Sequence, residues 1–156
     1  MNKKCLLDAD GYRTVFELKS IDSNREMLDL VVEFQVDPRL RKISVRSVSS
    51  YIDIKDLKRL VTYFEQHIAS LKENSNSKSS VFIEYGLSFQ IQASEGEIRS
   101  ESEGEFSLQV MVNIGQPAKG YPRTYIGGES VVTLENIQSF TSSVNELLTE
   151  LQPFSG

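Results

Sequence analysis

The chain has 156 residues, of which 39% are hydrophobic and 25% charged, and its formal net charge is −5. A chain of this length fits one domain, which buries roughly 70% of the surface that the unfolded chain exposes. The sequence contains no apolar run near the roughly 20 residues of a membrane-spanning helix, and no secretory signal follows Lys3 and Lys4. Together with a single cysteine, Cys5, these features predict a cytoplasmic domain spanning residues 1–156.

Charge is unevenly distributed along the chain. Residues 1–78 hold 14 Lys and Arg against 12 Asp and Glu, whereas residues 79–156 hold 3 against 10. Binding of nucleic acid requires a positive surface, which the sequence offers only locally, at Arg39, Arg41 and Lys42. We therefore expect neither nucleic acid nor a membrane as partner, and a basic protein is the better electrostatic match.

The first half predicts four strands followed by a helix. Two short strands are expected near residues 4–7 and 12–18, joined by a turn at 8–11. Strict alternation predicts a half-buried strand over 28–36, which Pro38 ends. The next strand starts at Ile43, and its phase slips before Val48, which indicates a bulge. Asp53 is a suitable N-cap for a helix that runs to about Leu71, and a polar loop follows over 73–80.

The second half repeats this plan. Strands are expected near 80–85, 87–93 and 97–101, with a tight turn over 93–96 in which Gly96 supplies a positive φ. A second alternating strand covers 106–114, and a last strand runs over 124–132, where the glycines at 127 and 128 suggest a bulge or a close backbone approach. Thr133 caps the final helix and Pro153 ends it.

The two helices carry apolar stripes of the same spacing, about eighty residues apart, which suggests an internal duplication. The first stripe comprises Ile54, Leu57, Leu60, Phe64, His67, Ile68 and Leu71, and the second Leu134, Ile137, Phe140, Val144, Leu147, Leu148 and Leu151. Short turns between consecutive strands favour antiparallel pairing. Alternation of apolar and polar residues leaves one face of the sheet exposed to solvent. The sequence therefore predicts a two-layer α+β domain, with a large curved antiparallel sheet and both helices packed on one face.

Two residues with potential chemistry have a structural interpretation. His67 is the only histidine, and no Cys, Asp or Glu stands at a spacing that would complete a metal site with it. Cys5 lies in a short apolar strand and is expected to be a buried small hydrophobe. We predict no catalytic residue, no metal and no cofactor.

The densest acidic segment contains Glu95, Glu97, Glu101, Glu103 and Glu105, with Arg99 as its one cation. Such carboxylates are most often the solvated face of an exposed hairpin, where charge protects an edge from aggregation. The alternative is an acidic docking surface. Tyr121 and Tyr125, which flank Arg123, are candidate interface anchors, although ordinary half-buried aromatic residues at a strand end are the commoner case.

The order of parts resembles a known family. The segment YIDIKDLKRLVTYFEQHIASL is followed by FIEYGLSFQIQASEGEIRSESEGEFSLQVMVNI, and SVVTLENIQSFTSSVNELLTEL follows that. Over residues 4–151 this pattern is similar to the WapI-like immunity proteins of bacterial contact-dependent toxin systems. The resemblance implies a small cytoplasmic protein that neutralises a cognate toxin by binding it, and it implies no catalytic residue.

These observations favour a non-enzymatic protein that binds and inhibits a basic toxin, with Glu97, Glu101, Glu103, Glu105, Tyr121 and Tyr125 as candidate contacts. A small-ligand-binding or structural domain is the second hypothesis, which a deep apolar pocket would favour. An enzyme is the third, which a buried pair of carboxylates with shifted pKa values would favour. The pattern specifies no oligomeric state.

Overall fold

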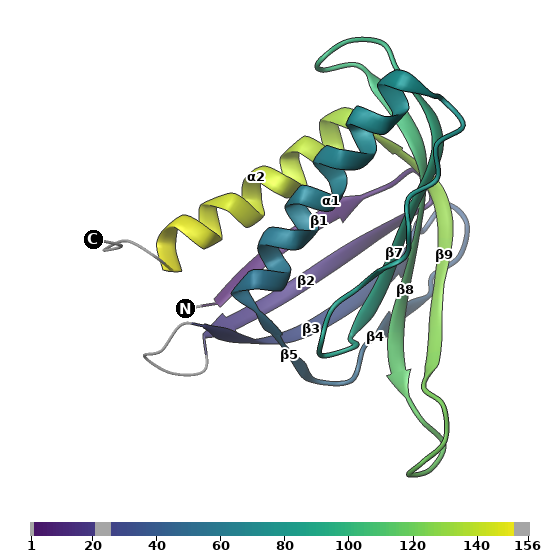
Figure 1. Cartoon of the computed structure of the whole chain (residues 1–156). Coiled ribbons are helices and arrows are strands. Elements are labelled where there is room, and N and C mark those ends of the chain that lie inside the picture. Colours follow the sequence, from purple (N-terminus) through teal and green to yellow (C-terminus); the bar gives the residue numbers. More distant parts are fainter. Residues whose placement is uncertain (1, 21–25, 152–156) are drawn as a thin grey trace.

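The computed structural model describes residues 2–20 and 26–151, which form nine strands and two helices (Figure 1). In chain order they are β1 (Asn2–Asp8), β2 (Tyr12–Ser20), β3 (Met27–Val36), β4 (Ser44–Arg46), β5 (Ser50–Asp53), α1 (Ile54–Glu73), β6 (Phe82–Ile83), β7 (Phe89–Ile98), β8 (Gly104–Gly115), β9 (Thr124–Thr133) and α2 (Leu134–Leu151). Within these described ranges, neither helix is long and apolar enough to cross a membrane.

The strands are all antiparallel and divide into two sheets. Sheet A has the order β1-β2-β3-β4, with β5 also paired to β3, and sheet B has the order β6-β7-β8-β9. The two sheets touch where the N–H of Val48 donates to the carbonyl of Asn113 (2.9 Å) and the N–H of Asp10 to that of Val131 (2.8 Å). The predicted α+β class, with two helices on antiparallel strands, is confirmed. The strands form two sheets in contact rather than one continuous sheet.

The predicted bulge before Val48 corresponds to a break between β4 and β5, which lie one after the other along the same side of β3. Ser47 bridges the break, because its N–H donates to the carbonyl of Val32 (2.7 Å) and its Oγ accepts from the N–H of Val32 (2.9 Å). The side chain thereby replaces a backbone acceptor, and the backbone of Val48 turns toward sheet B.

One prediction in the second half is wrong. The segments near 87–93 and 97–101 are not separate strands joined by a turn at 93–96, because β7 runs continuously to Ile98 with a register shift between Ala93 and Gly96. The turn lies at 99–103 instead, where the N–H of Arg99 donates to the carbonyl of Glu103 (2.8 Å). Gly96 is required by close packing: a Cβ there would lie 2.1 Å from the carbonyl oxygen of Glu105.

Both helices begin where their caps predict. Asp53 accepts from the N–H of Lys55 (2.7 Å) at the start of α1, and Thr133 Oγ1 accepts from the N–H of Asn136 (3.2 Å) at the start of α2. Pro153 lies outside the described residues. The predicted apolar stripes are buried, with Ile68 only partly so.

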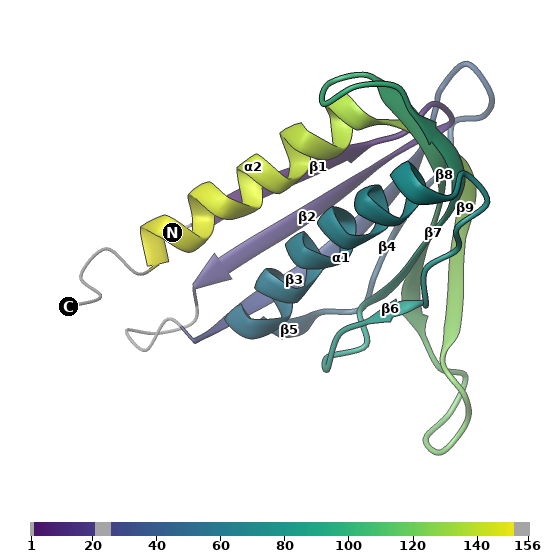
Figure 2. The same ribbon diagram turned by 45° about the horizontal axis from the view of Figure 1, so that its top comes forward.

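The helices cover the inner side of the sheets, and each contacts the other half of the chain (Figure 2). α1 packs mainly on β7, whereas α2 packs mainly on β1. Between the helices, the rings of Phe64 and Phe140 meet edge to face with centroids 6.0 Å apart. The two halves thus share one hydrophobic core, which leaves the outer faces of both sheets to solvent.

Candidate binding surface

The acidic hairpin, residues 95–105, connects β7 to β8 and brings its carboxylates together. Glu97 and Glu105 are direct cross-strand partners, and their side chains are 68% and 49% exposed. Like charges in such positions destabilise a strand pair. Arg99 lies between them, with its Nη2 3.5 Å from Glu105 and 3.8 Å from Glu97, and offsets part of the repulsion.

The turn of the acidic hairpin is held in place by polar contacts. Ser100 Oγ accepts from the N–H groups of Ser102 and Glu103, and the carbonyl of Glu101 accepts from Gln138 Nε2 of α2 (2.7 Å). The side chains of Glu101 and Glu103 are exposed. The backbone is therefore fixed while four carboxylates face solvent at one end of the molecule.

The sequence did not predict two further carboxylates near the acidic hairpin: Asp10 lies beside Glu105, and Glu129 lies four residues farther along the same face. Asp10, in the turn between β1 and β2, lines a small hollow of about 110 Å³ together with Glu105. Glu129 lies on β9 on the same outer face of sheet B as Glu97 and Glu105, by the strand register. The alternation of the predicted last strand would have been enough to place Glu129 on this face. Asp10 lies there because it contacts Val131, which is more than a hundred residues away in the sequence.

The two candidate tyrosines are not part of the acidic hairpin. Tyr125 pairs with Asn113 and Glu105 pairs with Thr133, so eight residues, roughly 26 Å of strand, separate the two positions. Tyr125 is half-buried and donates its hydroxyl to the carbonyl of Leu87 (3.3 Å), whereas Tyr121 is 62% exposed in the β8–β9 loop. The six predicted contact residues thus form two separate groups.

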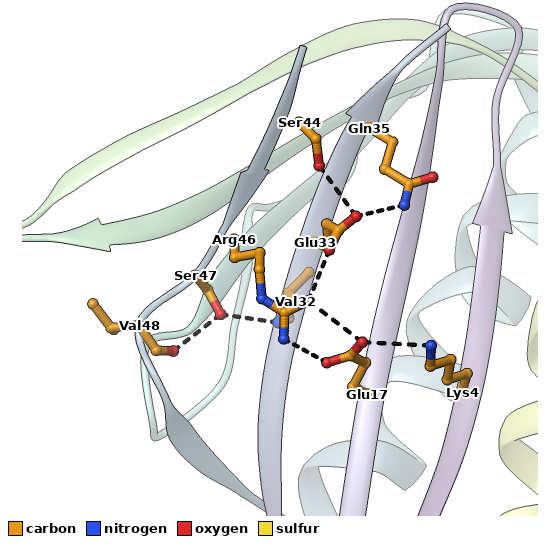
Figure 3. Close-up of polar contacts among 9 residues, drawn as sticks. All are labelled: Lys4, Glu17, Val32, Glu33, Gln35, Ser44, Arg46, Ser47 and Val48. Atoms are coloured by element: carbon orange, nitrogen blue, oxygen red, sulfur yellow. Dashed lines mark hydrogen bonds and ion pairs between the residues drawn. The ribbon is translucent and has the colours of Figure 1, made fainter. Parts of the chain in front are cut away.

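The outer face of sheet A carries charges that neutralise one another (Figure 3). Arg46 bridges two strands, with Nη2 2.7 Å from Glu17 and Nη1 2.8 Å from Glu33, and Lys4 lies 3.7 Å from Glu17. The hydrogen bond from Arg46 holds the pKa of Glu17 below its usual value, and that of Glu33 is lowered first by Gln35 and then by Arg46. This network stabilises both carboxylates in their charged form. Because two cations, Arg46 and Lys4, balance these two negative charges, the network presents little net charge to a partner.

Two hollows of the described surface have volumes of about 810 and 700 Å³, and the second lies over β1, β2 and β3. The hollow of about 810 Å³ lies between the β1–β2 and β3–β4 connections, and half of its fourteen lining residues are charged. Two of its cations are already paired, Arg13 with Asp8 and Arg39 with Asp37. It is therefore not the deep apolar pocket that a small-ligand-binding domain would present.

His67 and Cys5 are both buried, as their sequence context predicts. His67 is fully buried; its Nε2 donates to the carbonyl of Ser94 (2.8 Å) and its Nδ1 accepts from the hydroxyl of Ser79 (2.7 Å). A carbonyl can only accept, which fixes the neutral tautomer, and burial lowers the pKa of the ring. Cys5 is buried, and burial raises the pKa of its thiol, so the reactive thiolate is disfavoured.

Glu84 is a buried carboxylate at the end of β6. Burial raises its pKa, and the backbone N–H groups of Ser88, Gly86 and Phe89 oppose the increase. The N–H of Ser88 donates to its Oε1. Gly86 and Ser88 belong to the loop that follows Glu84 and Phe89 begins β7, so the carboxylate organises the connection between β6 and β7. Among the residues that the structure describes, no three His, Cys, Asp or Glu side chains are arranged to hold a metal ion.

A scan against protein-family models finds no model that matches this chain, and a search of curated proteins finds no match either. Function is therefore inferred from the surface of the molecule.

Proposed function

We propose that this chain is a non-catalytic protein-binding domain that acts as an immunity-type inhibitor of a cognate bacterial toxin, and that a basic surface of the toxin docks on the acidic hairpin. The observation that carries the proposal is the direct pairing of Glu97 with Glu105, beside the exposed Glu101 and Glu103. This arrangement works against the stability of the hairpin itself. A partner that supplies positive charge would relieve the repulsion.

The distribution of charge over the molecule supports the same proposal. Sheet A pairs three of its carboxylates, Asp8, Glu17 and Glu33, with Arg13, Arg46 and Lys4. The three long strands of sheet B contain four Glu and no Lys or Arg. A negative field at one end of a protein steers a basic partner toward it and raises the association rate. The resemblance to WapI-like immunity proteins implies the same class of partner.

The proposal predicts that Glu97, Glu101, Glu103 and Glu105 accelerate association. Changing all four to Gln should slow binding several-fold at low salt, and the difference should shrink as salt screens charges beyond about 8 Å. Folding should change little, because exposed charges contribute little to stability. Stopped-flow association with the product of a toxin-like gene next to this one, purified in a catalytically inactive form, measures the effect.

A matched control removes four negative charges elsewhere. Glu65, Glu73, Glu146 and Glu150 are exposed on the two helices, and their change to Gln alters the net charge equally. The control should leave the association rate within a factor of about two of wild type, since steering depends on where the field is. Equal rates for wild type and the hairpin variant would mean that the acidic hairpin is only solvated surface.

A further inference from the structure

The two sheets have four edges, and three of them are protected from pairing with another chain. β6 is only two residues long, and α1 covers it: Arg59 Nη2 donates to the carbonyl of Ile83 (2.7 Å). The β4–β5 edge is broken at Ser47 and turned toward sheet B. β1 carries Lys3 and Lys4, and Asn136 of α2 donates to the carbonyl of Asp8 (3.2 Å). Short length, breaks, lysines and covering elements are the usual means of blocking an edge.

β9 is the exception. It is ten residues long, it contains no Lys or Pro, and it is the outermost strand of sheet B in both views (Figures 1 and 2). Two apolar side chains on it, Ile126 and Val131, are 40% and 38% exposed. This combination marks a strand that is open to pairing.

The direction of the free backbone groups follows from one hydrogen bond. Asp10 donates to the carbonyl of Val131 from the side of β9 that faces away from β8. Backbone groups in an antiparallel pair alternate between the two sides of the strand, so those of Glu129 and Gly127 face the same open side. No other described segment forms a hydrogen bond with the backbone of these two residues.

We propose that the open edge of β9 accepts an extended segment of the partner protein in which Lys or Arg alternates with other residues, so that sheet B gains a fifth strand. This proposal rests on the proposed function and specifies how the partner binds. Neighbouring strands lie about 4.8 Å apart, so outward side chains of a strand added along Thr124–Glu129 would stand beside Glu129, on the face that also carries Glu105 and Glu97. The β1–β2 turn already occupies the edge at Val131.

Charge complementarity favours a basic segment over a second copy of this chain. The strands β7, β8 and β9 present four glutamates and no cation. A second copy paired through β9 would bring its own Glu97, Glu105 and Glu129 onto the same continuous face, where like charges repel. A segment with alternating cations would instead place positive charge beside Glu129, on the outer face of sheet B.

Proline substitution tests the edge while keeping the β8–β9 ladder intact. The N–H of Glu129 faces away from β8, so Glu129→Pro removes one donor of the open edge and places a ring in the path of an added strand. Glu129→Gln removes the charge and keeps the N–H. Leu6→Pro, on the β1 edge of sheet A, is the matched control. The backbone of Val32 bonds to Ser47 and so faces away from β2. Following the register from β3 through β2 to β1 then places the N–H of Leu6 on the side of β1 that faces away from β2.

The probe is a synthetic peptide of about ten residues in which Lys alternates with Thr, and the same peptide with Glu in place of Lys is the charge control. Binding is followed by NMR on the full chain, together with hydrogen exchange of the wild-type amides. We expect the Lys peptide to shift and protect the amides of Glu129 and Gly127, and the Glu peptide to have no effect. Glu129→Pro should weaken binding by about tenfold or more, Glu129→Gln by less, and Leu6→Pro not at all.

Three results would overturn the inference: no change at the β9 amides with millimolar Lys peptide, equal affinity for wild type and Glu129→Pro, or a dimer of the chain alone that Glu129→Pro dissociates. The last would identify a second copy as the occupant. Were Glu129→Pro to unfold, protection of the wild-type amides would decide alone. The effect of the four-glutamine hairpin variant on toxin association is measured separately, so the proposed function can stand when the edge inference fails.

Discussion

At the scale of single residues, His67 should make the protein sensitive to mild acid. Its pKa in the folded state lies below the ordinary value of 6.5 because burial disfavours the charged ring. The unfolded chain therefore takes up a proton first as pH falls below 6.5, and the stability contributed by neutral His67 is present above that pH and lost below it. His67→Gln should lower stability at pH 7.5 and reduce its loss between pH 7.5 and 5.5.

Urea midpoints of wild type and His67→Gln at the two pH values measure this effect. Partner binding at pH 7.5 should be unchanged, because the buried ring bonds to Ser79 and Ser94 and contacts Phe106 edge to face, away from the candidate binding surface. An unchanged pH slope in the variant would show that another group causes the acid sensitivity. Lost biological activity in a stably folded variant would instead support an enzymatic role.

Glu84 should have the opposite dependence on pH. Burial raises its pKa above the ordinary 4.5 in the folded state, so the unfolded chain releases its proton first as pH rises. The stability associated with neutral Glu84 is present below pH 4.5 and is lost as pH rises through the folded pKa. Glu84→Gln cannot ionise, so its stability relative to wild type should increase between pH 4.5 and 7.5. A difference that is the same at both pH values would contradict this assignment.

At the scale of elements, Phe64 and Phe140 join the two helices. Both are buried, and their rings meet edge to face at 6.0 Å. Changing either to Ala should cost about 3–5 kcal/mol, a large part of the roughly 5–15 kcal/mol that stabilises a domain. Because the rings touch, the double variant should lose less than the sum of the single losses. Tyr121→Ala, at an exposed site, is the control and should change stability by less than about 0.5 kcal/mol.

The elements that the sequence predicted well are those with a buried face. α1, α2, β3 and β8 each place apolar residues at a regular period, and a regular period survives any tertiary arrangement. β7 lacks this signal beyond Ala93, where Ser94, Glu95 and Glu97 face solvent or the bulge. Gly96 was therefore interpreted as a turn residue, although the close approach of the Glu105 carbonyl is what requires it. Close approaches depend on the neighbouring strand, which local sequence does not reveal.

For the candidate surface too, the sequence predicted the parts that depend on local order and missed those that depend on tertiary contacts. The glutamates of the acidic hairpin are near in sequence, so their proximity followed from any hairpin. Asp10 reaches Glu105 only because the β1–β2 turn contacts β9. The open edge of β9 depends on which strands end each sheet, and strand order is a property of the assembled fold.

At the scale of the whole molecule, the helix of each half of the chain packs mainly on a strand of the other half. The helix of the first half packs on β7 of the second, and the helix of the second packs on β1 of the first. Neither half can therefore bury the apolar stripe of its own helix without the other. One common hydrophobic core thus supports the solvent-exposed outer faces of both sheets. A partner that binds sheet B would therefore bind a surface whose position depends on both halves of the chain.

This exchange predicts that the chain unfolds as one cooperative unit. Fragments 1–78 and 79–156 should each lack a cooperative thermal transition, while the intact chain shows a single one that circular dichroism and calorimetry report alike. The control is a circular permutant opened between Ser75 and Asn76, with the original ends joined by a short linker. Lys3 Nζ lies 3.4 Å from Glu146 Oε2, so the start of β1 and the last part of α2 are close enough to connect. The permutant should fold with one transition, because it breaks the chain at the same loop yet keeps both helices on their exchanged strands. Independent melting of either fragment near the temperature of the intact chain would show that the halves are separate domains.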